Sequence, residues 1–244
     1  MNMVFPFVPA TNTAAAVWIE DRLQSFAESV LSIVPAKFSA YARVYHPAWQ
    51  TINGQRTVIR WSDVATATNS VIHRQMQWPN IVDGYNPTHP PALNGSFEEP
   101  STGSLPPKVS RPLWQALAPH TTTPEYCWFA VWEGHGCLNA LVPSSPSFAI
   151  PHRRFHLFHA SIEAIEASFS DSSFHQSANL WWPSDCAWCV ATEIDFMTTY
   201  VAGTDAAIAA LIACTELEVD KVEPTDGVTW ASDTLNPPPS QSYT

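Results

Sequence analysis

Residues 179–200, NLWWPSDCAWCVATEIDFMTTY, constrain the fold of this chain more than any other stretch. Two aromatic, β-prone runs flank the turn-forming triplet Pro183-Ser184-Asp185. The pattern predicts a β-hairpin, with arms near 179–182 and 187–196, at the centre of one sheet. Side chains alternate along a strand, so one face of the second arm is expected to carry Cys189, Ala191, Glu193 and Asp195. The hairpin therefore brings two carboxylates onto the sheet.

Apolar spacing predicts the other elements. Alternating or aromatic-rich runs indicate strands near 38–46, 126–133 and 154–160, and helical spacing indicates helices near 14–33, 63–77 and 205–214. A shorter helix is expected at 111–118. Pro, Asn, Gly and Ser dominate residues 83–107, which predicts a long irregular loop.

The chain is long and apolar enough for one large core, at 244 residues and 45% hydrophobic content. We therefore predict the α+β class, with a single globular domain over residues 1–235. Its mainly antiparallel mixed sheet, with the central aromatic-rich hairpin, is expected to be covered by three or four helices. Consecutive prolines predict a flexible tail at 236–244.

The net charge of -11 is placed unevenly. Residues 1–125 carry eight basic and eight acidic residues, whereas residues 126–244 carry three basic and fourteen acidic ones. An acidic surface repels nucleic acid and anionic membranes and attracts basic proteins. The sequence thus indicates a possible basic protein partner and neither nucleic-acid nor membrane binding. The alternative is that the charge only keeps a tryptophan-rich surface soluble.

Five cysteines, an odd number, and the absence of a basic, uninterrupted apolar start indicate reduced thiols and a cytoplasmic protein. Cys186 and Cys189 have CxxC spacing, which suits a redox dithiol or half a zinc site. In a turn followed by a strand, buried inert thiols are the favoured interpretation. No complete hydrolase elbow or phosphate-binding glycine loop is present.

The most suggestive polar set joins two predicted strands. Glu193 and Asp195 would face His152, Arg154 and His156 if the two strands are neighbours. Carboxylates and imidazoles can form an acid/base pair or part of a metal site. The alternative is a structural cluster of ion pairs, in which Arg154 and the histidines neutralise the acids. We expect no metal and no cofactor.

Aromatic side chains form a second candidate site. Two aromatic sets could line a ligand cleft: Trp128, Phe129 and Trp132, and Trp181, Trp182 and Trp188. The expected binding residues are Trp132, Trp181, Trp182, Asp185 and Arg154. Aromatic pairs on adjacent strands are also an ordinary way to pack a sheet, and that interpretation is favoured.

Three segments carry a family resemblance: CWFAVWEGHG (127–136), RRFHLFHA (153–160) and SANLWWPSDCAWCVATEIDFMTTYVAG (177–203). Together they resemble a group of uncharacterised actinobacterial hypothetical proteins that share a CWFAxWxGxG block and an NLWWPxDxAWCVATEID block. The resemblance implies a bacterial cytosolic protein and brings no activity or site residue with it. Where such proteins carry an aromatic residue, this chain has His135.

These observations favour a non-catalytic soluble binding protein that presents an acidic surface to a basic or polar partner, as inhibitor and immunity-type proteins do. The first alternative is a hydrolase-type enzyme, possibly metal-dependent, that uses His152 or His156 with Glu193 and Asp195. The second is an assembly role in which exposed tryptophans form a homo-oligomer interface. The hydrolase requires the polar set to converge in a concave pocket.

Overall fold

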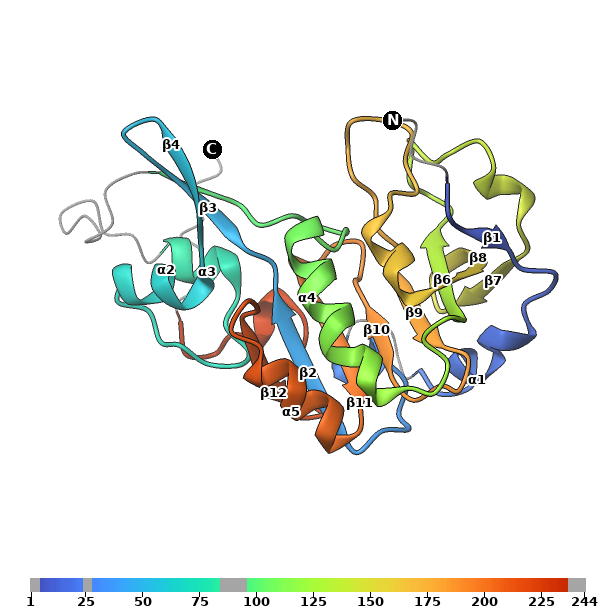
Figure 1. Ribbon diagram of the computed structural model, residues 1–244. Helices are drawn as coiled ribbons and strands as arrows, with labels where there is room; N and C mark the ends of the chain where they lie inside the picture. Colours follow the sequence, from blue (N-terminus) through green and yellow to red (C-terminus); the bar gives the residue numbers. More distant parts are fainter. Residues whose placement is uncertain (1–4, 24–27, 84–95, 237–244) are drawn as a thin grey trace.

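The computed structural model describes residues 5–23, 28–83 and 96–236, and Figure 1 shows their arrangement. Over these residues twelve strands form two sheets, joined by five α-helices and six short 3-10 helices. The strands are β1 (Val8–Pro9), β2 (Ala40–Tyr45), β3 (Ala48–Ile52), β4 (Gln55–Ile59), β5 (Ser96–Glu98), β6 (Cys127–Trp132), β7 (Ser147–Ile150), β8 (Arg153–Ala160), β9 (Leu180–Pro183), β10 (Cys189–Ala191), β11 (Thr198–Gly203) and β12 (Val219–Val222). The α-helices are α1 (Val17–Glu20), α2 (Trp61–Ala67), α3 (Trp78–Asp83), α4 (Pro107–Leu117) and α5 (Asp205–Ala213). The 3-10 helices are Ala14–Ala16, Val30–Ser32, Ala118–His120, Val142–Ser144, Ile162–Glu166 and Trp230–Ser232.

The larger sheet has the order β1-β8-β6-β9-β10-β11-β2-β12, with β7 also paired to β8. Its neighbours are all antiparallel. β9 and β10 form the expected hairpin in the middle of this order, with Trp181 opposite Val190. The structure confirms the predicted α+β domain with an antiparallel sheet and a central aromatic-rich hairpin.

The two faces of this sheet are covered by different parts of the chain. α4 and α5 lie across one face (Figure 1), where Leu113 and Leu211 share a buried cluster with Trp181. On the other face, Ile19 from the N-terminal segment belongs to the cluster that contains Trp182. Trp181 and Trp182 are adjacent in β9, so strand alternation sends their rings to opposite faces. The hairpin thus supplies a tryptophan to each half of the core.

The smaller sheet, β4-β3-β5, packs at one end of the molecule (Figure 1). β3 and β4 are joined by Asn53 and Gly54, both with positive φ (50° and 79°). An Asn-Gly pair between two strands is a strong hairpin signal, and the sequence analysis overlooked it. Trp61 of α2 and Trp78 of α3 form a third buried cluster beside this sheet.

Helix α5 occupies the predicted range because its start is specified locally. Thr204 is the N-cap, and its side-chain oxygen accepts a hydrogen bond from the N–H of Ala207 at 3.2 Å. Helix α4 was expected at 111–118 but begins earlier, at Pro107. Proline suits the first turn of a helix, because an N–H at that position would have no hydrogen-bond partner within the helix. These two helices therefore cover the central strands.

The helix expected at 14–33 is wrong over the described residues. α1 spans only four residues, Val17–Glu20, and a separate 3-10 helix follows at Val30–Ser32. Ser29 forms a β-bridge with Gly227, and the N–H groups of Val30 and Leu31 donate to carbonyl oxygens of Asp226 and Pro224. Backbone pairing with a distant segment therefore replaces the helical hydrogen bonds that the apolar spacing favoured.

The helix expected at 63–77 ends early. α2 stops at Ala67, because Asn69 adopts a left-handed conformation (φ 60°) and the N–H of Ser70 donates to the carbonyl of Ala65 at 2.8 Å. Trp78, expected to end the helix, instead begins α3. The sequence pattern missed an αL helix end that asparagine tolerates.

Two further expectations fall partly outside the described residues. In the expected loop 83–107, residues 84–95 are not described, Ser96–Glu98 forms β5 and α4 begins at Pro107. In the expected tail, residues 237–244 are not described. Asn236 itself is buried and hydrogen-bonded, so the flexible tail cannot begin at this residue.

Candidate functional site

Glu193 and Asp195 lie in the turn between β10 and β11, so the predicted strand 187–196 is wrong from residue 192 onward. The N–H of Phe196 donates to the carbonyl of Glu193 at 3.1 Å, and the N–H of Asp195 donates to Glu193 Oε2 at 2.7 Å. These bonds close a tight turn, after which β11 runs back along β10. The strand alternation assumed for the two carboxylates therefore stops at Ala191.

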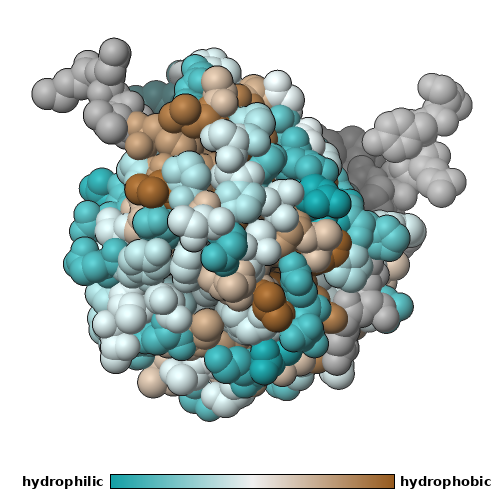
Figure 2. All heavy atoms as spheres, turned by 90° about the vertical axis from the view of Figure 1, so that its right-hand side faces the viewer, coloured by the Kyte–Doolittle hydropathy of each residue, from teal (hydrophilic) through white to brown (hydrophobic). Residues whose placement is uncertain are grey.

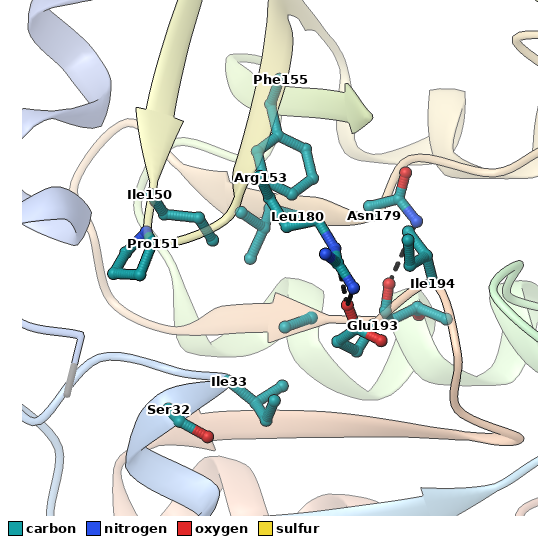
Figure 3. Close-up of a pocket in the computed structure, with 12 residues that line it drawn as sticks. Ser32, Ile33, Ile150, Pro151, Arg153, Phe155, Asn179, Leu180, Glu193 and Ile194 are labelled. Carbon is teal, nitrogen blue, oxygen red and sulfur yellow. Dashed lines mark hydrogen bonds and ion pairs between the residues drawn. The ribbon is translucent and has the colours of Figure 1, made fainter. Parts of the chain in front are cut away.

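Arg153 pairs with both carboxylates, and Figure 3 shows its contact with Glu193. Its guanidinium donates from Nε to Glu193 Oε1 and from Nη2 to Asp195 Oδ2, each at 3.1 Å. The side chains of Arg153 and Glu193 are only 16% and 12% exposed, whereas that of Asp195 is 72% exposed. The arrangement is the ion-pair cluster that the sequence analysis left open, with Arg153 in the place expected for Arg154.

The predicted basic residues contact other elements. Arg154 pairs with Glu133 at 3.7 Å, and His156 Nδ1 lies 3.3 Å from the carbonyl oxygen of Ser145. Both side chains alternate to the side of β8 opposite Arg153, while His152 is an exposed residue of the turn before β8. Of the predicted set of His152, His156, Glu193 and Asp195, His156 therefore lies away from the two carboxylates, with which Arg153 pairs. Arg153 was absent from the predicted set because the expected strand, 154–160, begins one residue after the observed start of β8.

Substituting Arg153 by Gln is expected to lower the free energy of unfolding by about 1–2 kcal/mol, because Glu193 keeps its charge at a largely buried position without a cation. The matched control is R154Q, whose ion pair is half exposed on both sides and should contribute less than about 0.5 kcal/mol. Urea unfolding of the three proteins measures both values. Equal losses in the two variants would show that the Arg153 cluster is an ordinary surface pair.

A small cavity lies beside the Arg153 cluster, lined among others by Ser32, Asn179 and Thr192 (Figure 3). Its volume is about 30 Å³, enough for a water molecule or two rather than for a substrate. Both the oxygen and the nitrogen of the Asn179 side-chain amide are hydrogen-bonded. Oδ1 accepts from the backbone N–H of Trp132 and from His135 Nε2. Nδ2 donates to the carbonyl oxygens of Gly103 and Thr192. This buried amide is a structural link between three segments.

The tryptophans proposed for ligand binding divide into two groups. Trp181 and Trp182 are fully buried, so they belong to the core and line no accessible cleft. Trp132 is half-buried, and its ring lies 5.8 Å from the Arg153 guanidinium and 5.2 Å from the His135 ring. The aromatic pattern of the hairpin is therefore explained by sheet packing, the favoured interpretation.

Asp185, another predicted binding residue, is exposed, but its carboxylate oxygens already accept hydrogen bonds within the protein. Its oxygens accept from the hydroxyl of Thr121, the N–H and hydroxyl of Thr122, and the N–H of Ala187, at 2.7–3.1 Å. Burial raises the pKa of Asp185, but these hydrogen bonds outweigh it and leave the pKa below its usual value. The residue ties the hairpin turn to residues 121–122.

The five cysteines are free. Cys189 is buried in β10, and burial raises its pKa well above the usual range, while Cys127 has a pKa raised to about 12 by the same cause. Burial also raises the pKa of Cys186. The thiolate is the reactive form of cysteine, and a raised pKa keeps a thiol protonated. The raised pKa values of Cys186 and Cys189 therefore support inert thiols rather than a redox dithiol.

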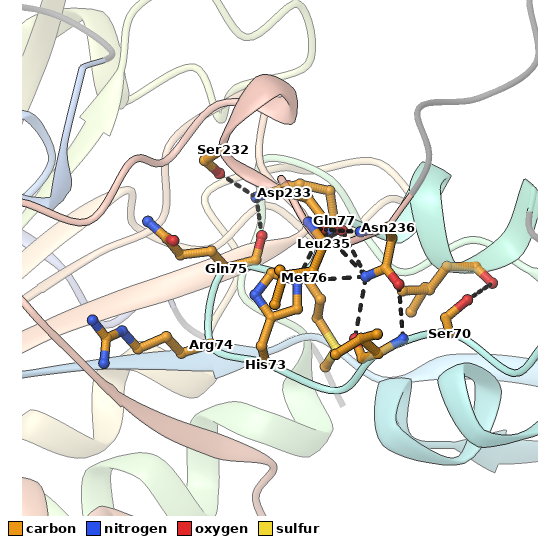
Figure 4. A network of polar contacts seen from close by, with 12 residues as sticks. Ser70, His73, Arg74, Gln75, Met76, Gln77, Ser232, Asp233, Leu235 and Asn236 are labelled. Carbon is orange, nitrogen blue, oxygen red and sulfur yellow. Dashed lines mark hydrogen bonds and ion pairs between the residues drawn. The ribbon is translucent and has the colours of Figure 1, made fainter.

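A network of polar contacts joins the segment at 70–77 to the C-terminal segment (Figure 4). His73 Nε2 lies 2.8 Å from Asp233 Oδ1, and Asp233 also accepts from the Gln77 N–H and from Asn236 Nδ2. Burial raises the pKa of Asp233, but hydrogen bonds from Asn236 and Gln77 outweigh it and lower the pKa. Asn236 in turn exchanges two hydrogen bonds with the backbone of Val71. This His–Asp pair therefore fastens two segments together.

A larger cavity, the acidic pocket, lies beside the 3-10 helix Ile162–Glu166, with a volume of about 580 Å³. Its ionisable lining residues are all carboxylates, Glu163, Glu166 and Asp171, and its lining also includes Phe5 and Ser168. No basic side chain is among the described residues that line it. No motif in the sequence distinguishes these residues, and the acidity of the second half is the signal that indicates them.

The uneven charge of the sequence is partly cancelled by the fold. Arg74 pairs with Asp226 at 2.6 Å and Arg111 pairs with Glu166 at 2.7 Å, so basic residues of the first half neutralise acids of the second. On the face drawn in Figure 2, hydrophobic residues form separate patches between hydrophilic and neutral ones. The two ion pairs neutralise part of the negative charge of the second half of the chain.

Among the described residues, no group of three or more His, Cys, Asp or Glu side chains is placed to hold a metal ion. No helix in the described part of the chain is long and apolar enough to cross a membrane. Comparison with protein-family models, with curated proteins and with solved structures finds no match for this chain.

Proposed function

We propose that this protein is a non-catalytic binding protein that takes a cationic group of a basic partner into the acidic pocket, as inhibitor and immunity-type proteins bind their targets. The observation that carries the proposal is a cavity of about 580 Å³ in which every charged lining residue that the structure describes is a carboxylate. A volume of this size is typical of binding sites. The hydrolase alternative has less support, because Arg153 pairs with Glu193 and Asp195 and His156 lies beside the carbonyl oxygen of Ser145.

The three carboxylates differ in what they can offer a ligand. Glu166 is held by Arg111 and by Trp114 Nε1, and the Arg111 hydrogen bond lowers its pKa, so it stays ionised. Asp171 accepts one hydrogen bond, from Asn139 Nδ2 at 2.6 Å. Glu163 is exposed and has no hydrogen-bond or ion-pair partner among the described residues. Glu163 and Asp171 are therefore available for charge-assisted hydrogen bonds to an ammonium or guanidinium group.

The double variant E163Q/D171N is expected to bind a basic peptide about tenfold more weakly than the wild type, because it removes two charges without changing side-chain size. The probe is a fluorescein-labelled GKGRG peptide, and the measurement is fluorescence anisotropy at ~20 and ~150 mM NaCl. Wild-type binding should weaken as salt rises, since the charges of the pocket are partly exposed to solvent.

The matched control is E125Q/E216Q, which makes the same change in net charge at two exposed positions outside the pocket. It should bind the peptide within about twofold of the wild type. Equal weakening by both double variants would mean that the peptide senses only net charge, and no binding at either salt concentration would remove the proposal.

A further inference from the structure

A second cavity, the arginine pocket, lies where β2, α2, α3 and the β10–β11 turn meet residues 228–230. Its volume is about 280 Å³, and its lining includes Arg43, Trp61, Trp78, Asp195, Phe196 and Trp230. None of these residues lines the acidic pocket. The two cavities therefore differ in both position and chemistry.

Arg43 is buried in the middle of β2, with 2% of its surface exposed. Its Nη1 donates to the carbonyl oxygens of Arg74 and Met76, at 3.1 and 2.8 Å. Its Nε has no hydrogen-bond partner among the residues that the structure describes. An arginine keeps its positive charge in proteins, so this strand contains a buried cation with an unsatisfied donor.

No ion pair joins Arg43 to a carboxylate in the described part of the chain. The cross-strand neighbour Asp220 accepts the hydroxyl of Tyr45 at 2.8 Å, and Asp226 is held by Arg74. The rings of Tyr45 and Trp61 lie 4.8 and 5.5 Å from the guanidinium carbon and stabilise the charge in part. Burial of a charge without a counter-ion in contact remains costly, so an anion in the pocket would be stabilised.

The walls of the arginine pocket determine which uncharged part of such an anion can bind. Trp61 and Trp78 are buried, with ring centroids 5.4 Å apart, and Phe196 adds a third aromatic residue. Trp230 also lines the cavity and is 68% exposed. Planar, apolar walls favour an aromatic ring, and at protein packing density the cavity has room for roughly ten non-hydrogen atoms.

From these observations we propose that the arginine pocket binds a small aryl carboxylate, with Arg43 supplying the positive charge and the tryptophans the apolar walls. Asp195 is the one carboxylate among the described residues of the lining. Arg153 lies 3.1 Å from it but also pairs with Glu193, so the negative charge of Asp195 is only partly offset. The attraction for a monoanion comes from the buried charge of Arg43, while the side chain of Asp195 is 72% exposed, so that solvent screens its repulsion. The proposal is independent of the acidic pocket and of a basic partner.

The test is isothermal titration calorimetry of the full chain with phenylacetate and with phenylacetamide, a neutral molecule of the same size and shape. Phenylacetate is expected to bind with a Kd on the order of 100 µM, and at least about tenfold more tightly than the amide. Equal affinity for the two molecules, or no binding of phenylacetate at ~5 mM, would overturn the proposal.

Three variants locate the binding site. Arg43→Met should abolish the preference for the acid, and Trp230→Ala, at an exposed position, should weaken phenylacetate binding about three- to tenfold. Arg154→Met removes an exposed arginine elsewhere and should leave the affinity unchanged. Should Arg43→Met fail to fold, Trp230→Ala decides: unchanged affinity contradicts the assigned pocket. The variant E163Q/D171N should bind phenylacetate normally, which separates this proposal from the acidic pocket.

Discussion

Replacing Gly103 by alanine is expected to lower the free energy of unfolding by about 4 kcal/mol. Gly103 has a positive φ of 71°, which costs an L-residue about 1 kcal/mol. A Cβ at this position would overlap the backbone carbonyl oxygen of Ile194, and relief of such overpacking typically costs about 1–3 kcal/mol. Any shift also disturbs the hydrogen bonds of the Gly103 carbonyl with Gln176 Nε2 and Asn179 Nδ2. Backbone atoms cannot move aside as a flexible side chain can.

The matched control is Gly54→Ala. Gly54 also has a positive φ, of 79°, but no atom of the described part of the chain lies within 4 Å of the added Cβ. Its substitution should therefore cost only the conformational term, about 1 kcal/mol. Denaturant unfolding of both variants separates strain from overlap. Similar losses at the two positions would mean that Ile194 does not approach residue 103 as closely as the structure indicates.

Lowering the pH from 7 to 4 is expected to remove about 3 kcal/mol of stability through His46 alone. The ring is fully buried: Nδ1 donates to the carbonyl of Ser101 at 2.6 Å, so Nε2 accepts the hydroxyl of Thr199 at 2.9 Å. Burial lowers the pKa of His46 to about 4, and the nearby charge of Arg43 acts in the same direction. An unfolded histidine titrates near 6.5. Between these values the unfolded state binds the extra proton, so stability falls as the pH falls, at about 1.4 kcal/mol per pKa unit.

Two measurements check the role of His46. Its ring proton resonances should show no titration above about pH 5 in the folded protein. The free energy of unfolding of H46Q should be lower than that of the wild type at pH 7 but should change less between pH 6.5 and 4. The control H120Q removes a partly exposed histidine and should keep the wild-type pH dependence. An unchanged slope in H46Q would assign the acid sensitivity to other groups.

Local signals identified part of the fold from the sequence. Alternation and aromatic content located β6, β8, β9 and the start of β10, and Thr204 located α5, because strand alternation and an N-cap are set by residues close in the chain. Three segments departed from prediction for a common reason. Residues 28–33 pair with residues 224–227, Asn69 ends α2 and residues 192–197 turn instead of extending β10. In each segment, backbone pairing or a local backbone conformation outweighed the apolar pattern from which a helix or strand had been predicted.

The candidate sites depend still more on tertiary contacts. Residue types alone suggested that Glu193 and Asp195 would meet basic side chains, and they do, but strand alternation and the end of β10 selected Arg153. Arg43 had a signal that went unused, since a lone arginine inside the apolar run YARVY requires an explanation when the strand is buried. The residues that line the acidic pocket have no comparable signal in the sequence around them.

By itself, the sequence determined the α+β class, the central hairpin, the major cover helix α5 and the excess of negative charge in the second half. These properties follow from residue spacing and composition over short windows. Only the tertiary structure decided which charges neutralise one another, which tryptophans are buried and where cavities remain. Those outcomes depend on distances between residues far apart in the chain, and a distance of that kind has no signature in spacing or composition.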